Sequence, residues 1–290
     1  MSTFLITSGN IGEPAALELA RLGHRVRLLV RHLKPNATLD QAGIEQVEGD
    51  LSQPQTLTKA FDGVEKYLSV TPFVENLVDL GRNAVQAAKA AGVKHFVRSS
   101  ARGAGPEAIT MGRWHYAVEQ LVEDSGLDFT ILQPASFYQN FMGNAGSIAS
   151  SNTFYSSADT GQAALIDARD IASAAVAVLT QPGHAGKRYE LTGNESLSNA
   201  DLATQLSEVL GRPIHFHNLT EDEMKAAMTG QQMPAWMADA FVELDRVTRL
   251  GYVAAPTPDT ERLLGRPPIT FRQFAQENKA AFAAKVPVAA

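Results

Sequence analysis

Residues 3–22 read TFLITSGNIGEPAALELARL, and this stretch decides the fold. The run from Phe4 to Thr7 is short and apolar, which predicts a strand. Gly9 and Gly12 indicate a tight turn, and the apolar spacing from Pro14 to Leu22 predicts a helix. A strand, a glycine turn and a helix in this order are typical of the first unit of a doubly wound α/β fold.

The same alternation continues outward from this unit. Further strands are predicted at 26–30, 44–47, 64–71, 93–99 and 129–132. Helices are predicted between them at 54–61, from Val74 to Ala88 and around Trp114 to Val122, the first with a capping box of Ser52 and Gln55. Strands that alternate with helices predict a Rossmann-type, doubly wound parallel sheet with helices on both faces.

The second half of the chain is less regular. An alanine-rich helix from Asp170, a strand at 187–191 and a strand at 214–219 that leaves the main sheet are predicted there. Three further capping boxes are expected, at Ser198 with Asp201, Thr220 with Glu223, and Thr270 with Gln273. The segment 254–268, rich in Pro and Gly, is interpreted as a surface connection.

These elements predict two parts. Residues 1–135 are expected to form an NAD(P)-binding Rossmann domain, with elements that return to it from about 160–195. Residues 136–290 are expected to form mainly a smaller, substrate-binding C-terminal lobe.

The composition excludes several classes of protein. The 290 residues are 44% hydrophobic and 19% charged, which is typical of a globular chain. The formal net charge of −6 argues against binding to nucleic acid or to acidic membranes. The chain contains no cysteine, which excludes disulfides, thiolate nucleophiles and cysteine-ligated metals. No signal peptide or spanning segment is evident, so a soluble cytoplasmic protein is predicted.

The glycine turn is a candidate phosphate site. Gly9 and Gly12 let the backbone approach a pyrophosphate, and the N–H groups near Asn10 and Ile11 precede a helix N-terminus. The alternative is a tight turn that binds no ligand.

Basic residues follow the second strand and point to the choice of cofactor. Arg31 and Lys34 stand where an acidic residue would hold the ribose of NAD, and no acid occurs between residues 26 and 39. NADPH is therefore predicted in preference to NADH, with a solvated basic turn as the alternative. Asp50 and Leu51, after the third strand, are expected to contact the cofactor, with Asp50 near the adenine. Asp50 could instead be a turn residue or a helix cap.

Several motifs together resemble the NmrA-like group of atypical short-chain dehydrogenases/reductases. They are TSGNIG at 7–12, EGDL at 48–51, RSSA at 98–101, GRWH at 112–115, TILQP at 130–134, FYQN at 137–140, DIA at 170–172, YELTG at 189–193 and LLGRPP at 263–268. The resemblance implies a Rossmann fold that binds NAD(P)H. It also implies the reduction of quinones, azo compounds or triphenylmethane dyes, or regulation without known turnover, as in NmrA itself. The turn departs from the family pattern, because the loop is two residues shorter and the first glycine is missing.

The candidates for the catalytic residues differ from those of ordinary short-chain dehydrogenases. Ordinary short-chain dehydrogenases use Tyr-x-x-x-Lys, and no tyrosine of this chain has a lysine four residues later. His115 stands where relatives often carry a lysine, and Glu119 follows it at a spacing that permits contact on one helix face. His115 is predicted to contact the cofactor or, as a catalytic candidate, to donate a proton. The alternative is a surface histidine.

Residues at the ends of the predicted strands complete the expected site. Thr71, Pro72 and Ser99 are predicted to border the cofactor, and Pro134 and Phe137 to cover its nicotinamide, although loop hydrogen bonding explains Ser99 equally well.

Aromatic and methionine residues of the second half are candidates for an acceptor site. Tyr138, a second catalytic candidate, and Phe141 are expected to form an aromatic wall, unless they are core residues. Methionines at 224, 228, 233 and 237 beside Trp236 suggest a hydrophobic lid, or simply helix packing.

The sequence thus predicts an NADPH-dependent reductase that transfers hydride directly to a flat conjugated acceptor, without flavin or metal. Azo compounds, quinones, imines and triphenylmethane dyes are the candidate acceptors. A monomer or a homodimer is expected, with no nucleic-acid or membrane partner. The alternative function is a non-catalytic NADP(H)-binding redox sensor of the NmrA type.

Overall fold

The computed structural model describes residues 2–283, which fall into two compact units. The first unit contains the chain up to Pro134, Ala168–Leu191 and Asp259–Arg266. The second contains Ala135–Asp167, Thr192–Pro258 and the residues from Pro267 onward. Neither unit is therefore a continuous piece of chain. The sequence assigned the segment 259–266 to a surface connection, whereas it joins the first unit and holds a short helix, α11 (Asp259–Leu264).

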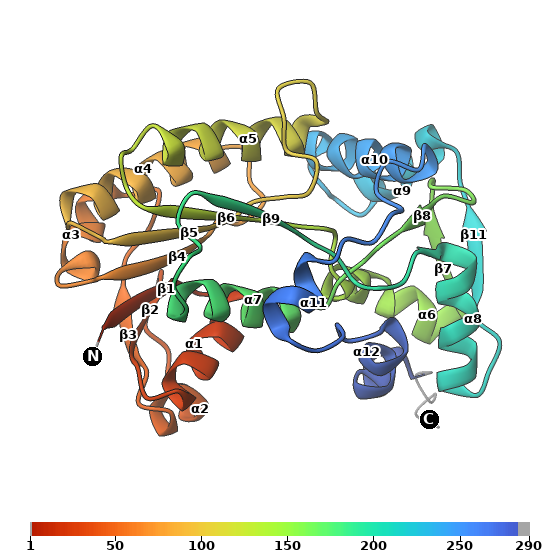
Figure 1. Cartoon of the computed structure of the whole chain (residues 1–290). Helices are drawn as coiled ribbons and strands as arrows, with labels where there is room; N and C mark the ends of the chain where they lie inside the picture. Colours follow the sequence, from red (N-terminus) through yellow and green to blue (C-terminus); the bar gives the residue numbers. More distant parts are fainter. Residues whose placement is uncertain (1, 284–290) are drawn as a thin grey trace. The chain divides into compact units, whose positions relative to one another are not determined.

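A seven-stranded parallel sheet, with strand order β3-β2-β1-β4-β5-β6-β9, forms the centre of the first unit (Figure 1). Its strands are β1 (Thr3–Thr7), β2 (Arg25–Val30), β3 (Glu45–Glu48), β4 (Lys66–Val70), β5 (His95–Ser99), β6 (Phe129–Pro134) and β9 (Lys187–Leu191). The predicted doubly wound sheet is confirmed. The strand order reverses between β1 and β4, which is where open α/β sheets bind ligands at their carboxyl edge.

Helices cover both faces of this sheet (Figure 1). They are α1 (Gly12–Arg21), α2 (Ala37–Gln41), α3 (Leu57–Phe61), α4 (Leu77–Ala90), α5 (Thr110–Glu123), α7 (Ala168–Thr180) and α11. Helices α4 and α5 pack together on one face, and α1 packs with α7 on the other. Gly81 makes the first contact possible, because a Cβ there would lie 2.6 Å from the methyl carbons of Val118.

The second unit contains two small sheets and several helices. In its sheets, β7 (Thr153–Ser156) pairs in parallel with β11 (His215–Asn218), and β8 (Gln162–Ala163) pairs with β10 (Leu197–Ser198). Its helices are η2 (Tyr138–Asn144), α6 (Ala145–Ser151), α8 (Asn199–Leu210), α9 (Glu221–Gly230), α10 (Ala235–Arg249), α12 (Phe271–Glu277) and α13 (Lys279–Phe282). The prediction that the strand near residue 215 leaves the main sheet is confirmed.

Three of the four predicted capping boxes are confirmed, at the N-termini of α8, α9 and α12. The box predicted at Ser52 is wrong. The backbone N–H and the hydroxyl of Ser52 both donate to Oδ1 of Asp50, at 2.8 Å each. The hydroxyl is thus taken by an Asx-type turn, and the following 3₁₀ helix, η1 (Pro54–Thr56), has no side-chain cap.

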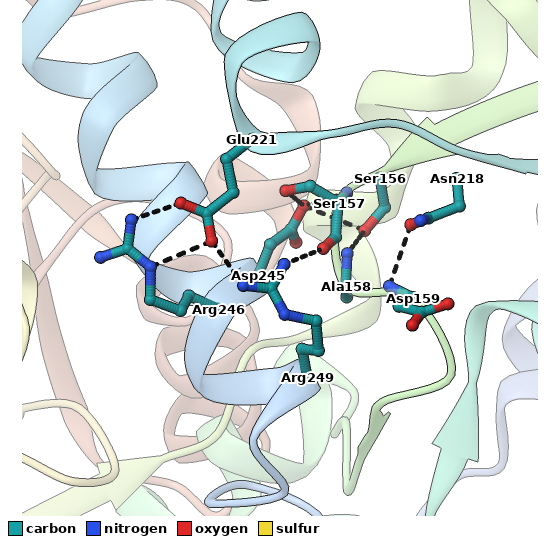
Figure 2. Close-up of polar contacts among 9 residues, drawn as sticks. All are labelled: Ser156, Ser157, Ala158, Asp159, Asn218, Glu221, Asp245, Arg246 and Arg249. Carbon is teal, nitrogen blue, oxygen red and sulfur yellow. Dashed lines mark hydrogen bonds and ion pairs between the residues drawn. The ribbon is translucent and has the colours of Figure 1, made fainter.

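A polar network ties three segments of the second unit together (Figure 2). Oδ2 of Asp245 on α10 accepts hydrogen bonds from the hydroxyl of Ser156 (3.0 Å) and from the backbone N–H (2.7 Å) and hydroxyl (2.9 Å) of Ser157. Arg249 donates to the carbonyl of Ser157 (3.0 Å) and to Glu221 (2.6 Å). Arg246 binds both carboxylate oxygens of Glu221. We call these residues the Asp245–Glu221 network.

Candidate functional site

The turn after β1 is shaped by its two glycines. Gly9 has φ +126°, a conformation that L side chains rarely adopt. A Cβ on Gly12 would lie 1.8 Å from the carbonyl oxygen of Thr7, so no side chain fits there. The N–H of Ser8 donates to the carbonyl of Leu29 at 3.1 Å, which holds this turn beside the end of β2.

The helix that follows this turn presents unpaired amides. Ile11 is the N-cap residue of α1, and no side chain caps the helix. Within residues 2–283, the backbone N–H groups of Asn10, Ile11 and Gly12 donate to no protein acceptor. Free amides at a helix N-terminus bind phosphate, because they add to the positive end of the helix dipole. The turn therefore fits the pyrophosphate of a dinucleotide, although the loop is shorter than the family pattern.

The basic residues after β2 are solvent-exposed. Arg31 and Lys34 both lie on the surface, and the guanidinium of Arg31 makes no hydrogen bond or ion pair within the described chain. The backbone of Lys34 is held by the side-chain amide of Gln46, whose Nε2 donates to its carbonyl at 2.7 Å. An unpaired guanidinium next to the glycine turn is suited to a 2′-phosphate.

Asp50 has the turn role that the sequence left open. Its carboxylate accepts from Ser52 and lies near the charge of Arg31. The hydrogen bonds from Ser52, aided by Arg31, hold the pKa of Asp50 below its ordinary value. Leu51 is buried, and its carbonyl accepts from Asn83 Nδ2 at 2.8 Å. The contacts of both residues with a cofactor stay predictions.

The carboxyl ends of β4 and β5 bring Thr71, Ser99 and a buried arginine together. Arg98 is 0% exposed, and its Nη2 donates to the hydroxyl of Thr71 at 2.8 Å. Pro72 is exposed beside Thr71, and Ser99 is buried at the end of β5. Burial lowers the pKa of Arg98 to about 10, so its guanidinium stays charged at neutral pH.

His115 on α5 lies against the same guanidinium. Its Nδ1 is 3.2 Å from Nη2 of Arg98, and its side chain is 9% exposed. Burial, together with the charge of Arg98, lowers the pKa of His115 to about 3. The imidazole is therefore neutral at physiological pH. The sequence analysis assumed an ordinary histidine that titrates near neutrality, and this assumption does not hold because the ring of His115 is buried beside the charged Arg98.

Glu119 has other partners than His115. It is fully buried, and its carboxylate accepts from the hydroxyl of Ser100, from Nε2 of Gln133 and from Arg188 on β9. The contact between His115 and Glu119 that their spacing permits is not formed, because the carboxylate joins α5 to the sheet.

Pro134, Phe137 and Tyr138 lie where β6 ends and the second unit begins. The carbonyl of Pro134 accepts from the N–H of Arg102 at 2.9 Å, and Phe137 is half-buried and bridges to Ile166. Tyr138 is 1% exposed and packs against Phe271 and Phe274 of the second unit. This environment matches the core alternative for Tyr138, and its catalytic role stays a prediction.

Three of the methionines proposed as a lid lie in a contact between helices of the second unit. Met224, Met228 and Met233 pack in one cluster with Ala238 and Val242. This arrangement agrees with helix packing, which was the alternative to a hydrophobic lid.

Other features of the described chain lie apart from these residues. A hollow of about 200 Å³ lies among α1, α7 and α11, and none of the predicted site residues lines it. Between residues 2 and 283, no three His, Asp or Glu side chains gather as metal ligands. No helix in that range is long and apolar enough to cross a bilayer.

Arg98 is the residue that the sequence analysis missed. It appeared there only within a family motif, although the sequence held a signal: a charged residue in an otherwise apolar strand, HFVRS. A charge in a buried strand needs a partner, and the nearest candidates were the polar residues after the neighbouring strands.

The chain is similar to known proteins over nearly its whole length. The model of the NmrA-like family matches residues 3–262. An NAD(P)H azoreductase from Xenophilus azovorans is 39% identical over 278 residues, which cover 96% of this chain and 97% of that protein. The crystal structure of the NADPH-dependent quinone oxidoreductase QOR2 from Escherichia coli with NADPH superimposes with a TM-score of 0.84 at 27% identity, covering 94% of this chain and 99% of that one. The triphenylmethane reductase of a Citrobacter species with NADP(H) gives a TM-score of 0.84 at 25% identity, covering 95% and 99%.

Proposed function

Because the chain belongs to the NmrA-like family, we propose that this NAD(P)H-dependent oxidoreductase uses NADPH to reduce a flat conjugated acceptor without a flavin or a metal. The observation that carries the proposal is the exposed Arg31 beside a glycine turn whose helix amides have no protein partner. The azoreductase, quinone oxidoreductase and triphenylmethane reductase relatives support azo compounds, quinones and cationic dyes as acceptors. A cyclic imine belongs to the same chemical class.

The chain's own residues would bind and orient the two reactants. The amides at 10–12 would hold the pyrophosphate, and Arg31 with Lys34 would neutralise the 2′-phosphate. Thr71, Ser99 and His115 lie at or beside the carboxyl ends of the central strands and would border the nicotinamide half. Bound NADPH would supply the hydride. The protein supplies position and a low-dielectric surrounding, which are large contributions to such a reaction.

The reaction is tested by NADPH oxidation with purified protein. The acceptors are one quinone, one azo dye, one triphenylmethane dye and one cyclic imine, each with NADPH and with NADH. We expect turnover of at least one acceptor, faster with NADPH. Binding of NADPH without turnover of any acceptor would instead support the redox-sensor alternative.

Arg31→Ala tests the cofactor preference. Loss of a hydrogen-bonded charge pair costs roughly 1.5–3 kcal/mol, so NADPH affinity should fall about ten- to hundredfold while NADH affinity changes little. Arg25→Ala is the matched control, because Arg25 is an exposed arginine at the amino end of β2, away from the glycine turn. An unchanged ratio of NADPH to NADH affinity in Arg31→Ala would show the assignment to be wrong.

A further inference from the structure

The guanidinium of Arg98 is buried without enough acceptors. Its Nη2 reaches Thr71 and His115, but Nε and Nη1 have no hydrogen-bond partner among the described residues. A buried charge with unused donors is costly, so such a group is a candidate for a function beyond packing.

The contact between Arg98 and His115 determines which ring nitrogen of His115 carries the proton. A guanidinium has only donors, so Nδ1 of His115 must accept the hydrogen bond with its lone pair. A neutral imidazole carries one ring proton, and with Nδ1 as acceptor that proton lies on Nε2. The partner of one ring nitrogen thus determines what the other nitrogen offers to a ligand.

We propose that Arg98 is a positioning residue that holds His115 as the neutral Nε2–H tautomer, so that His115 presents a permanent hydrogen-bond donor. The proposal rests on the proposed function only for the identity of the group that this donor meets, which would be an oxygen or nitrogen of the cofactor or of the acceptor. The role differs from that of a general acid, because the neutral ring donates a hydrogen bond without transferring its proton.

The charges around His115 agree with this assignment. Arg98 faces the ring from β5, and β6 carries no charged residue. On α5 itself, Glu119 is used by Ser100, Gln133 and Arg188. The charged residues of α4 are exposed: Asp79, Arg82 and Lys89. Among residues 2–283, no carboxylate forms a hydrogen bond or ion pair with His115, which agrees with its lowered pKa.

Nuclear magnetic resonance of the full chain without cofactor or acceptor tests the tautomer directly. The chain has seven histidines, so His115→Gln identifies the signals of His115 in ¹⁵N-histidine-labelled protein. Long-range ¹H–¹⁵N spectra distinguish the two tautomers and the protonated ring. We expect the Nε2–H form alone at every pH from about 5 to 8, well above the depressed pKa. An Nδ1–H form, or titration of wild-type His115 within that range, would overturn the proposal.

Two variants show whether Arg98 is the cause. In Arg98→Met the ring should populate both tautomers, and its pKa should rise because the charge of Arg98 is gone, while burial of the ring keeps the pKa below its ordinary value. Arg98→Lys keeps a charged donor and should restore the Nε2–H form. His95 is the internal control, because it lies on the same strand with its Nε2 at 2.9 Å from the Thr130 hydroxyl and should not change. If His115 in Arg98→Met keeps the wild-type spectrum, Arg98 does not set the tautomer.

These spectra test the role of Arg98 separately from the proposed reductase activity. They need neither NADPH nor turnover, so a failed reductase assay leaves the tautomer result unaffected. If Arg98→Met does not fold, the wild-type spectra alone still decide between the two tautomers.

Discussion

The two units each hold a polar network built on arginine, and the networks differ in how completely their groups are paired. In the Asp245–Glu221 network, one carboxylate oxygen of Asp245 accepts from three donors and both oxygens of Glu221 accept from arginines (Figure 2). Around Arg98 the donors outnumber the acceptors, and two guanidinium nitrogens are unused. The two networks also differ in solvent exposure: the side chain of Arg98 is fully buried, whereas Arg246 and Arg249 are exposed.

This difference in pairing indicates that one network stabilises the fold and that the other controls the protonation of a neighbouring residue. Paired acceptors at loop and helix ends fix segments in place, and their removal should cost stability. An incompletely paired buried charge contributes little net stability, yet it alters the protonation of its neighbours. Both networks lower a pKa, with opposite effects on charge: ion pairing lowers the pKa of Glu221 to about 2 and keeps the carboxylate charged, whereas burial of the ring beside Arg98 lowers the pKa of His115 and keeps the imidazole uncharged.

Asp245→Ala should show the largest effect on stability. It leaves the N–H and hydroxyl of Ser157 and the hydroxyl of Ser156 without their acceptor, and Ser156 and Ser157 are buried. We expect the free energy of unfolding in urea to fall by about 2–4 kcal/mol. NADPH affinity should stay at the wild-type value.

Asp239→Ala is the control for that loss. Asp239 lies on the same helix and forms an exposed ion pair with Lys225, which is worth about 0.5 kcal/mol. If Asp245→Ala is no more destabilising than Asp239→Ala, the network does not anchor α10.

Glu221 should give a smaller, pH-dependent effect. Its folded pKa of about 2 lies below the ordinary 4.5, so its contribution is present above pH 4.5 and is lost as the pH falls toward 2. Because its side chain is 26% exposed, we expect about 1 kcal/mol after solvent screening. The difference in the free energy of unfolding between the wild type and Glu221→Gln should therefore be largest at pH 6 and clearly smaller at about pH 2.5, close to the folded pKa. An equal difference at both values would contradict this role.

Among the substitutions in the two networks, Arg98→Met should change stability least. The substitution removes one hydrogen-bonded nitrogen but also two donors that have no partner, and methionine fills a similar volume. We expect the free energy of unfolding to change by less than about 1 kcal/mol. If Arg98→Met lowers the free energy of unfolding as much as Asp245→Ala does, both networks stabilise the fold and the proposed difference between them is wrong.

Much of the fold could be predicted because local signals agreed with one another. Apolar strand runs, glycines after helices and three capping boxes each fixed an element boundary by short-range chemistry. The failures involve longer-range contacts. Ser52 was predicted as a cap, but Asp50 two residues earlier competed for its hydroxyl. Helix α11 was hidden in a segment rich in Pro and Gly, and its assignment to the first unit depends on tertiary contacts with α7.

The candidate site likewise contains features that local sequence predicts and features that depend on long-range contacts. The glycine turn and Arg31 could be predicted, because consecutive residues create the turn and the strand end. The partner of His115 could not, because helical spacing favoured Glu119 while the sheet placed Arg98, 17 residues earlier in the chain, against the ring. Spacing along one helix shows which residues can meet, and the competing partners on other elements decide which ones do.

The interrupted path of the chain has a consequence for its synthesis. On the ribosome, β1 to β6 emerge first, and β6 then remains an open edge until β9 (Lys187–Leu191) follows, because residues 135–167 belong to the other unit. An unpaired edge strand is a template for wrong pairing between nascent chains. We therefore expect release of a truncated chain that ends before residue 187 to aggregate, and chaperones that shield strand edges to act on this protein during that interval.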